Sequence, residues 1–442
     1  MTRNEIMQII DKENIHFFRL QFVDILGFMK NVAIPRSQIE KALDGEMMFD
    51  GSSIDGFVRI NESDMYLKPD YDTFTILPWR NKAGVAAARI ICDVHKSDHS
   101  PFSGCPRVNL QRVLGEARQL GFTMNVGTEA EFFLFKRDEC GCPTTFTQDT
   151  AGYFSVDPDD FGIECRREII ETLEFMGFEI EASHHEVAEG KHEVNFKFAD
   201  ALACADNTVT FKWVVKTIAK KYGLHATFMP KPVFGINGSG MHTNQSLFHL
   251  DGTNAFFDKH DRLQLSEVAY QYIAGVMKNA RGFAAVTNPL VNSYKRLVPG
   301  YEAPVYVAWS ASNRSALMRI PASRGVGTRV EVRCPDPTCN PYLAFAMMLN
   351  SGLDGVRNKL SPPPSTDVNI YRMTDRQKRS AKIKNMPSSL KDAIAELKKN
   401  PIARKTLGGH IFEKYIEAKE AEWDQFRIAV TNWEHDNYLG VY

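Results

Sequence analysis

The amino-acid sequence predicts an α+β protein with a small N-terminal domain and a larger domain behind it. The chain has 442 residues, which exceeds the usual size of one domain. Its first hundred residues show mainly strand patterns around one helix, whereas strands and helices mix in the remainder. A turn-rich segment at 96–106 separates the two parts. We therefore expect one domain at residues 1–100 and a second at residues 101–442.

The composition is that of an ordinary globular protein. Hydrophobic residues make up 43% and charged residues 24% of the chain, which excludes a disordered chain, a fibrous protein and a coiled coil. Its 53 basic and 54 acidic residues nearly balance, so no basic excess would attract nucleic acid or an anionic membrane. No apolar run has the length of a membrane span, and the charged N-terminus lacks the apolar core of a signal peptide. The eight cysteines form no CxxC pair, so we expect free thiols and a cytoplasmic protein.

Local patterns place the elements of the smaller domain. Residues 1–13 form a charged amphipathic helix pattern in which the isoleucines share one face. Residues 17–24 alternate as in a strand, and 24–27 then has the pattern of a turn. A helix is expected after Pro35, and short strands are expected at 73–77 and 87–93.

Helical periodicity and glycine stops define the larger domain. Gly121, Gly177 and Gly223 each follow a helical pattern, as glycine commonly does at a helix end. We expect helices at 109–119, 165–176, 211–222, 266–280, 389–399 and 410–430, and another that begins at 341–350. We expect strands at 129–135, 178–182, 193–198, 225–229 and 329–333.

Two acidic residues, Glu129 and Glu131, lie two positions apart in a predicted strand and therefore share one face. Burial of both carboxylates in their ionised form is costly unless a cation lies between them. By itself, the pair fits either an exposed strand end or a metal site.

More candidate ligands follow in the segment Ser183-His-His-Glu-Val-Ala-Glu-Gly-Lys-His-Glu193. A turn at Glu189-Gly190 would fold two short strands together and bring Glu186 close to Glu193. The histidines do not have the HExxH spacing, and zinc sites rarely gather this many carboxylates. We therefore interpret these histidines as supporting or solvent-facing residues.

Two further segments carry candidate binding residues. Three glycines in Phe234-Gly-Ile-Asn-Gly-Ser-Gly-Met-His242 either let the backbone approach a ligand closely or form a plain turn. No P-loop motif occurs in the chain. Arg329, Glu331 and Arg333 share one face of a predicted strand, which fits either a solvated face or a charged site.

Together, these segments indicate metal-dependent phosphoryl chemistry. Five glutamates and one histidine suit two hard divalent cations, because oxygen-rich ligands select Mg²⁺ or Mn²⁺ over Zn²⁺. Arginines can neutralise the charge that builds on a transferring phosphoryl group. The arginines that precede residue 329 in this region are Arg296, Arg314, Arg319 and Arg324.

Six long motifs occur in order along the chain. They are Met48-Phe-Asp-Gly-Ser-Ser53, Glu129-Ala-Glu-Phe-Phe133, Ser183-His-His-Glu-Val187, Lys231-Pro-Val-Phe-Gly-Ile-Asn-Gly-Ser-Gly-Met-His242, Asn292-Ser-Tyr-Lys-Arg-Leu-Val-Pro-Gly-Tyr-Glu302 and Arg329-Val-Glu-Val-Arg333. The series resembles type I glutamine synthetases from about residue 15 to the C-terminus. The resemblance implies a β-grasp N-terminal domain and a catalytic domain with helices around an antiparallel sheet. It also implies ATP-dependent condensation of L-glutamate with ammonia through γ-glutamyl phosphate, a reaction of nitrogen assimilation that releases ADP and phosphate.

The resemblance also implies roles for individual residues, with two or more Mg²⁺ or Mn²⁺ ions per site and ATP as a substrate. One metal would be bound by Glu131, Glu186 and Glu193, and the other by Glu129, His242 and Glu331. Glutamate would contact Asn237, Gly238, His242, Arg296, Glu302, Arg314 and Arg333. ATP would lie near Glu181, Phe196, Asn244, Ser246, Arg314, Arg319 and Arg329. Asp50 and Glu302 would help to deprotonate ammonium, and Arg314 would spread the charge of the phosphoryl group.

The implied assembly is a homododecamer of two stacked hexamers, in which Asp50 serves the site of a neighbouring subunit and the C-terminal helix ties the rings together. The chain departs from the family at Thr128, where proline is common. It also lacks the acidic and proline residues that follow Tyr371 in the adenylylated subclass, and the insertion found there. It therefore resembles the shorter, feedback-inhibited subclass typical of Gram-positive bacteria, with Arg59 matching the glutamine-sensing arginine. That subclass implies a nitrogen-responsive transcription repressor as a partner.

Two other functions remain open to test. A ligase that joins glutamate to a polyamine or another amine would share the metal and ATP residues, but Asp50 and Glu302 favour ammonia. A catalytically inactive homologue would have lost metal ligands, and all six are present.

Overall fold

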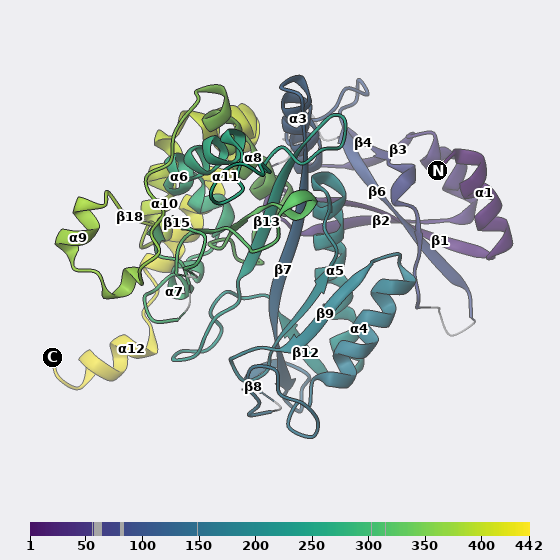
Figure 1. The fold of residues 1–442 in the computed structure, drawn as a ribbon. Coiled ribbons are helices and arrows are strands. Elements are labelled where there is room, and N and C mark those ends of the chain that lie inside the picture. Colours follow the sequence, from purple (N-terminus) through teal and green to yellow (C-terminus); the bar gives the residue numbers. More distant parts are fainter. Residues whose placement is uncertain (55, 57–63, 80–83, 148, 302, 314) are drawn as a thin grey trace.

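Two sheets, one in the first hundred residues and one in the remainder, organise the structure (Figure 1). The computed structural model describes residues 1–442 except 55, 57–63, 80–83, 148, 302 and 314. The smaller sheet has six strands in the order β2-β1-β6-β4-β3, with β5 beside β6. These strands are β1 (Ile15–Val23), β2 (Met29–Pro35), β3 (Met47–Asp50), β4 (Asp64–Pro69), β5 (Thr75–Ile76) and β6 (Ala86–His95).

Helices α1 (Arg3–Lys12) and α2 (Ile39–Leu43) cover the smaller sheet. Helix α1 begins at a capping box in which Thr2 and Glu5 satisfy each other's backbone N–H groups, and it buries two isoleucines in the core of this sheet. The predicted turn at 24–27 connects β1 to β2. The predicted arrangement of strands around a helix is therefore confirmed, and the boundary at residue 100 stays a prediction.

The larger sheet has ten strands, seven of them in the order β15-β16-β17-β13-β7-β10-β9. Strand β7 (Phe122–Arg137) lies at its centre and also pairs with β8, β11 and β12. Ala130, Phe132 and Leu134 on β7 are buried in the main core, so alternation turns Glu129 and Glu131 to the other face. The other strands are β8 (Pro143–Thr147), β9 (Ile180–His185), β10 (Lys191–Phe196), β11 (Ala199–Asp200), β12 (Leu224–Thr227), β13 (Met241–His249), β15 (Trp309–Ser310), β16 (Met318–Arg319) and β17 (Val330–Val332).

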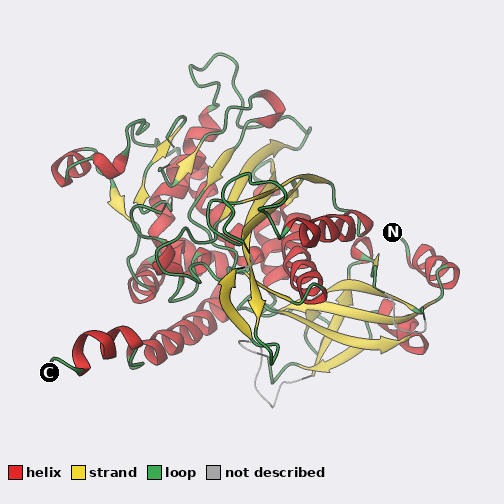
Figure 2. Cartoon of the chain, turned by 90° about the horizontal axis from the view of Figure 1, so that it is seen from below, coloured by secondary structure: helices red, strands yellow, loops and turns green. Residues whose placement is uncertain are grey.

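Helices complete the core around the larger sheet (Figures 1 and 2). Helix α5 packs on β7, and α6 packs along α8. None of the described helices is long and apolar enough to cross a membrane. The helices are α3 (Pro106–Gln119), α4 (Ile163–Phe175), α5 (Ala201–Lys221), α6 (Glu267–Thr287), α7 (Ser293–Arg296), α8 (Pro341–Arg357), α9 (Asp375–Ser380), α10 (Leu390–Lys399), α11 (Pro401–Arg427) and α12 (Asn432–Glu434), and a short pair β14 (Tyr306–Val307) and β18 (Lys384–Asn385) lies outside both sheets.

The structure corrects several predicted boundaries. Helix α5 begins at Ala201, ten residues before the expected start, because Asp200 caps it by accepting a hydrogen bond from the backbone of Leu202. Helix α11 begins at Pro401, where Asn400 caps it, but a kink at Gly408 divides it, so the expected start at 410 agrees with its second segment. Strand β13 was not predicted at all, although it carries part of the site described below.

A buried arginine, Arg107, connects the smaller sheet with helix α5, which packs on the larger sheet. Arg107 on α3 is 3% exposed and donates hydrogen bonds to Asp206 on α5, at 3.0 and 2.9 Å. The same guanidinium reaches Asp93 on β6 at 2.9 Å and Asp70, after β4, at 2.6 Å. Burial alone would lower the pKa of Arg107. The surrounding carboxylates have the larger effect, so the pKa of Arg107 lies above its usual value.

We expect Arg107→Met to lower the free energy of unfolding by about 3–5 kcal/mol, because the change leaves buried carboxylates without a cation. Chemical denaturation followed by circular dichroism measures the change. Arg118→Met, at an exposed position near the end of the same helix, is the control and should cost less than about 0.5 kcal/mol. Equal stability of the two variants would contradict the role of Arg107.

Candidate functional site

Strand pairing brings the predicted ligands to one face of the larger sheet. In the register of β7 and β13, Glu129 pairs with His242, and Gly127 pairs with Asn244. Glu331 on β17 pairs with Asn244 from the other side of β13. On the opposite edge of β7, Glu131 pairs with Glu193 on β10. Residues far apart in sequence therefore become neighbours through register alone.

The first cluster consists of Glu129, His242 and Glu331. The Nδ1 atom of His242 lies 3.3 Å from Glu129 Oε2 and 3.7 Å from Glu331 Oε1. Glu331 is only 2% exposed. It accepts hydrogen bonds from Arg319, at 2.8 Å, and from Arg333. One potential ligand atom from each of the three residues lies within 4.8 Å of the others, so the three residues could hold a metal ion.

The second cluster consists of His184, Glu186 and Glu193. The two ring nitrogens of His184 lie 3.6 Å from Glu186 Oε1 and 3.5 Å from Glu193 Oε1. The predicted fold-back of two strands around Glu189-Gly190 is confirmed, because β9 and β10 pair antiparallel there. The interpretation of His184 as solvent-facing is wrong, since its side chain is 16% exposed and touches both carboxylates.

Glu131 lies beside the second cluster and is held by two donors. Its Oε2 atom accepts a hydrogen bond from the backbone N–H of Gly240 at 2.6 Å. The Nζ atom of Lys191, the first residue of β10, lies 3.1 Å from the same oxygen and 3.3 Å from Glu186 Oε2. No motif in the sequence points to Lys191, although strand alternation places it on the same face as Glu193.

The charges in these clusters shift the pKa of each group in a consistent way. Burial tends to raise the pKa of Glu129, but hydrogen bonding to His242 and Asn244 lowers it to about 2. Burial likewise opposes the charge of Glu131, yet the ammonium of Lys191 holds the pKa of Glu131 below its usual value. Burial and the neighbouring Glu131 raise the pKa of Glu186. The second cluster thus carries more negative charge than its contacts neutralise, which favours a cation.

A buried polar network supports the second cluster from behind. His185 Nδ1 lies 2.7 Å from the backbone oxygen of Glu186, and its Nε2 lies 3.2 Å from Asp149 Oδ1. On β10, His192 Nδ1 accepts a hydrogen bond from Arg166 at 2.8 Å. His185 and His192 are fully buried and not solvent-facing, so the alternative of a supporting role is the one that fits.

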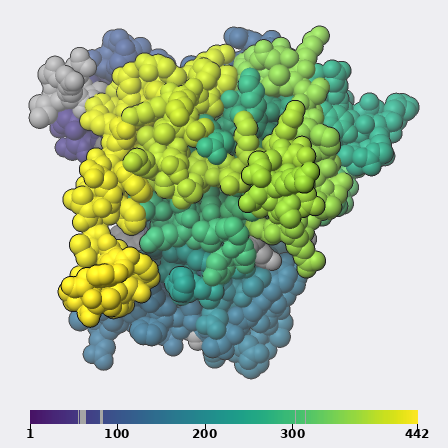
Figure 3. Space-filling model, turned by 90° about the vertical axis from the view of Figure 1, so that its left-hand side faces the viewer, coloured from purple at the N-terminus to yellow at the C-terminus, as the bar shows by residue number. Residues whose placement is uncertain are grey.

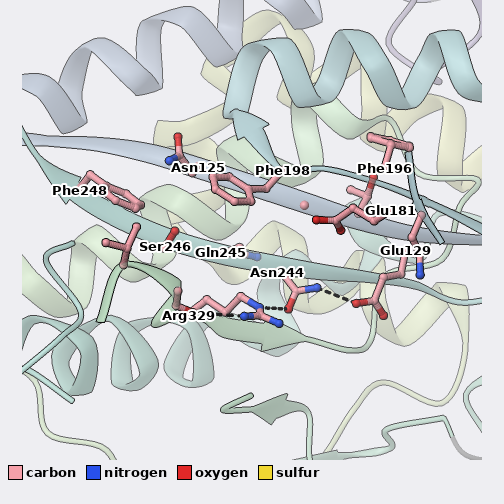
Figure 4. Close-up of a pocket in the computed structure, with 15 residues that line it drawn as sticks. Asn125, Glu129, Glu181, Phe196, Phe198, Asn244, Gln245, Ser246, Phe248 and Arg329 are labelled. Carbon is pink, nitrogen blue, oxygen red and sulfur yellow. Dashed lines mark hydrogen bonds between the residues drawn. The ribbon is translucent and has the colours of Figure 1, made fainter. Parts of the chain in front are cut away.

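A cavity of about 220 Å³ adjoins the first cluster (Figure 4). Five residues predicted to bind ATP line it, namely Glu181, Phe196, Asn244, Ser246 and Arg329. Figure 4 shows a chain of hydrogen bonds along one wall: Arg329 Nε donates to Asn244 Oδ1 at 3.1 Å, and Asn244 Nδ2 donates to Glu129 Oε1 at 2.9 Å. Arg319 does not line this cavity, because Glu331 holds its guanidinium. Phe198 and Phe248, which belong to none of the sequence motifs, add two apolar side chains to the lining.

The glycine-rich loop before β13 fits its surroundings because two of its positions, Gly238 and Gly240, have no side chain. A Cβ atom on Gly238 would lie 2.1 Å from the carbonyl oxygen of Pro230, and one on Gly240 would lie 2.6 Å from a guanidinium nitrogen of Arg296. Arg296 is 4% exposed and donates to the backbone oxygen of Cys334 at 2.8 Å. Arg296 therefore packs directly against the backbone of the loop at Gly238 and Gly240.

Of the remaining candidates, Asp50 and Asn237 lie outside the two clusters and the cavity lining. Asp50 ends β3 in the smaller sheet and accepts a hydrogen bond from the backbone of Ser52 at 2.8 Å, away from the cavity of the same chain. Asn237 lies in the glycine-rich loop. Arg59, Glu302 and Arg314 lie outside the described residues. Thr128, at the position where proline is common, is buried and its hydroxyl lies 3.2 Å from that of Thr208.

Comparison with known proteins identifies the family. Residues 14–97 match the model of the glutamine synthetase β-grasp domain, and residues 103–438 match that of the glutamine synthetase catalytic domain. The chain belongs to the glutamine synthetase family. A glutamine synthetase of Clostridium saccharobutylicum is 58% identical over 441 residues, which cover 100% of this chain and 99% of the relative. A glutamine synthetase of Staphylococcus aureus strain MRSA252 is 57% identical over 442 residues, with the same coverage.

Solved structures agree with this family assignment. A structure described as a GmaS–ADP complex superimposes with a TM-score of 0.89 at 32% identity, covering 98% of this chain and 99% of that one. A cryo-electron microscopy structure of Plasmodium falciparum glutamine synthetase has a TM-score of 0.87 at 24% identity and covers 99% of both chains, which supports the fold. The predictions of a β-grasp domain, an α+β catalytic domain and a type I glutamine synthetase are confirmed.

Proposed function

We propose that this glutamine synthetase condenses L-glutamate with ammonia at the face of the larger sheet, with ATP in the adjoining cavity. The observation that carries the proposal is the placement of two ligand clusters on one face of the larger sheet, with a cavity beside the first of them, in a chain 57–58% identical over its full length to glutamine synthetases. Two neighbouring clusters suit this reaction, because one cation would bind the phosphates of ATP while the other would bind the carboxylate of glutamate.

The ligand set fits hard divalent cations. Glu131, Glu186 and Glu193 are 6–8% exposed, and their buried carboxylates outnumber the cations that touch them. We assign one ion to these three glutamates and the second to Glu129, His242 and Glu331. When bound, Mg²⁺ or Mn²⁺ would polarise the substrate oxygens and neutralise phosphate charge.

The chain's own residues then have distinct tasks. Arg329, held by Asn244 and by the carbonyl of Gly327, places a guanidinium at the wall of the cavity, where it would bind a phosphate oxygen. Glu331 orients Arg319 and Arg333 toward the first cluster. The backbone of the glycine-rich loop would approach glutamate closely at Asn237 and Gly238. Glu302 would help to exclude water and deprotonate ammonium, and Arg314 would spread the charge of the transferring phosphoryl group.

We also propose the family's homododecamer, with Asp50 acting on the site of a neighbouring subunit. The C-terminal end of helix α11 extends away from the body of the chain (Figure 2). The residues after it protrude from the surface (Figure 3) and expose large apolar side chains, with Trp433 at 61%, Leu439 at 78% and Tyr442 at 98%. Such a segment is suited to burial against another subunit. Glutamine feedback through Arg59, a repressor partner and a cytoplasmic location stay predictions.

Phosphate release from ATP and glutamate tests the proposed reaction. We expect release to require Mg²⁺ or Mn²⁺ and to rise at least about tenfold when ammonium is added, with one glutamine formed per phosphate. A panel of methylamine, spermidine and putrescine at equal concentration is the comparison. A higher kcat/KM for any of these amines than for ammonium would favour the γ-glutamyl-amine ligase instead.

Arg329→Ala should raise the KM for ATP about 10- to 100-fold, because one charge-assisted hydrogen bond to a phosphate is lost. The change should leave the KM for glutamate within about threefold. Initial-rate kinetics with each substrate varied in turn measures both constants. Arg376→Ala, at an exposed position on α9, is the matched control. An unchanged KM for ATP in Arg329→Ala would remove Arg329 from the nucleotide site.

A further inference from the structure

Lys191 is a buried cation placed where the second cluster needs positive charge. The residue is 3% exposed, and its Nζ atom lies within 3.3 Å of carboxylate oxygens of both Glu131 and Glu186. A third contact, at 3.2 Å, joins the same nitrogen to the backbone oxygen of Gly238 in the glycine-rich loop. The three contacts match the three donors of an ammonium group.

The local fold fixes this position. Lys191 pairs with Phe133 in the register of β10 and β7, two residues before the pair of Glu193 with Glu131. The Phe133 ring belongs to a small apolar cluster on this face, with Phe135 and Ala188. The ammonium of Lys191 lies next to the carboxylates of Glu131 and Glu186 because the apolar cluster on its other side offers it no polar partner.

We infer that Lys191 is a resident counter-ion that competes with the divalent cation for the carboxylates of Glu131 and Glu186. This inference rests on the proposed function, because it concerns the metal assigned to Glu131, Glu186 and Glu193. Glu131 and Glu186 each contact the ammonium through one oxygen, Oε2. A metal ion coordinated by these two Oε2 atoms would lie close to the positive charge of Lys191 and be repelled by it. A metal ion bound through these two Oε2 atoms therefore requires the ammonium to withdraw.

Withdrawal of Lys191 would also free the carbonyl of Gly238. That carbonyl lies in the loop proposed to contact glutamate, so occupation of the metal site and the freedom of the loop are linked through one side chain. The resident ammonium keeps the metal-free cluster stable and makes this site the weaker of the two for Mg²⁺ or Mn²⁺. The histidine of this cluster cannot replace the ammonium at Glu131, because its two nitrogens face Glu186 and Glu193.

Titration with Mn²⁺ alone, followed by the electron paramagnetic resonance signal of the free ion, tests the inference on the full chain. In Lys191→Gln and Lys191→Met we expect one class of sites to bind Mn²⁺ at least about tenfold more tightly than in the wild type. Lys191→Arg keeps the charge and should show no tightening. Lys197→Gln removes a surface charge, paired with Glu179 near the end of the same strand, and is the matched control.

Thermal unfolding gives an independent readout. Without metal, the neutral variants should melt below the wild type, because the carboxylates lose their cation. With Mn²⁺, their melting temperature should rise more than that of the wild type, as linkage requires for tighter binding. Adding Glu193→Gln to Lys191→Gln should abolish the tightened class, which assigns it to the second cluster.

The outcomes separate this inference from the proposed function. If neither the wild type nor the variants bound Mn²⁺, the proposed metal site would fail and the inference with it. If Mn²⁺ bound to the wild type and to Lys191→Gln with equal affinity, or more weakly to the variant, the role of Lys191 alone would be overturned. Neutral variants that stayed unfolded even with Mn²⁺ would also overturn it, because the ammonium would then not be replaceable by a metal ion.

Discussion

Glu331→Gln is expected to reduce glutamine formation at least about 100-fold while the chain stays folded. The side chain keeps its volume, but the first cluster loses the carboxylate charge that a divalent cation needs. The change also leaves Arg319 and Arg333 without the carboxylate that orients them. This single substitution should therefore weaken metal binding and also disturb the positions of the two arginines.

Initial rates and Mn²⁺ stoichiometry measure the two defects in the same preparation. We expect the number of bound ions per chain to fall by one. Glu171→Gln, at an exposed position on α4, is the charge-matched control and should behave as the wild type. Circular dichroism confirms that both variants fold. Wild-type activity in Glu331→Gln would refute the assignment of the first cluster to a metal.

Mixed assemblies of Asp50→Ala and Glu331→Ala chains should regain activity that neither variant has alone. Asp50 lies on β3 of the smaller sheet, whereas Glu331 lies on β17 at the cavity side of the larger sheet. If Asp50 completes the site of the next subunit in a ring, the two changes damage different halves of each site. With random mixing, about one quarter of the sites receive both intact halves, since each half is intact with a probability of about one half.

Co-expression of two differently tagged variants, followed by tandem purification, provides the mixed assemblies. Activity should return to about one quarter of the wild-type value if the sites act independently. Mass spectrometry establishes that both variants are present in each assembly. Mixed assemblies that remain as inactive as the parent variants would show that one chain supplies both residues.

The sequence predicts the candidate ligands but not strand β13, which aligns them. Alternation placed Glu129 with Glu131, and Arg329 with Glu331, on shared faces, and the structure agrees. Strand β13 escaped prediction because polar residues occupy both of its faces. Thr243 and Gln245 are buried toward the core, where Gln245 accepts a hydrogen bond from Tyr272 at 2.7 Å, so no apolar alternation is visible.

The ion pairs between residues far apart in the chain could not be predicted from the sequence either. Arg107 meets Asp206 across 99 residues, and the contact of Lys191 with Glu131 spans a strand pair. Neither pair has a spacing that a local pattern could detect. A buried lysine on an acidic strand face could still have been suspected, because alternation alone puts it beside Glu193.

The product formed from ¹⁵N-ammonium in competition with an amine tests the central claim most directly. With ATP, glutamate and Mg²⁺, and with equal concentrations of ¹⁵N-ammonium and methylamine, we expect amide-¹⁵N glutamine in an amount equal to the phosphate released. Mass spectrometry quantifies both glutamyl products in one sample. A predominance of γ-glutamylmethylamide, or phosphate release without either product, would contradict the assignment of this site to glutamine synthesis.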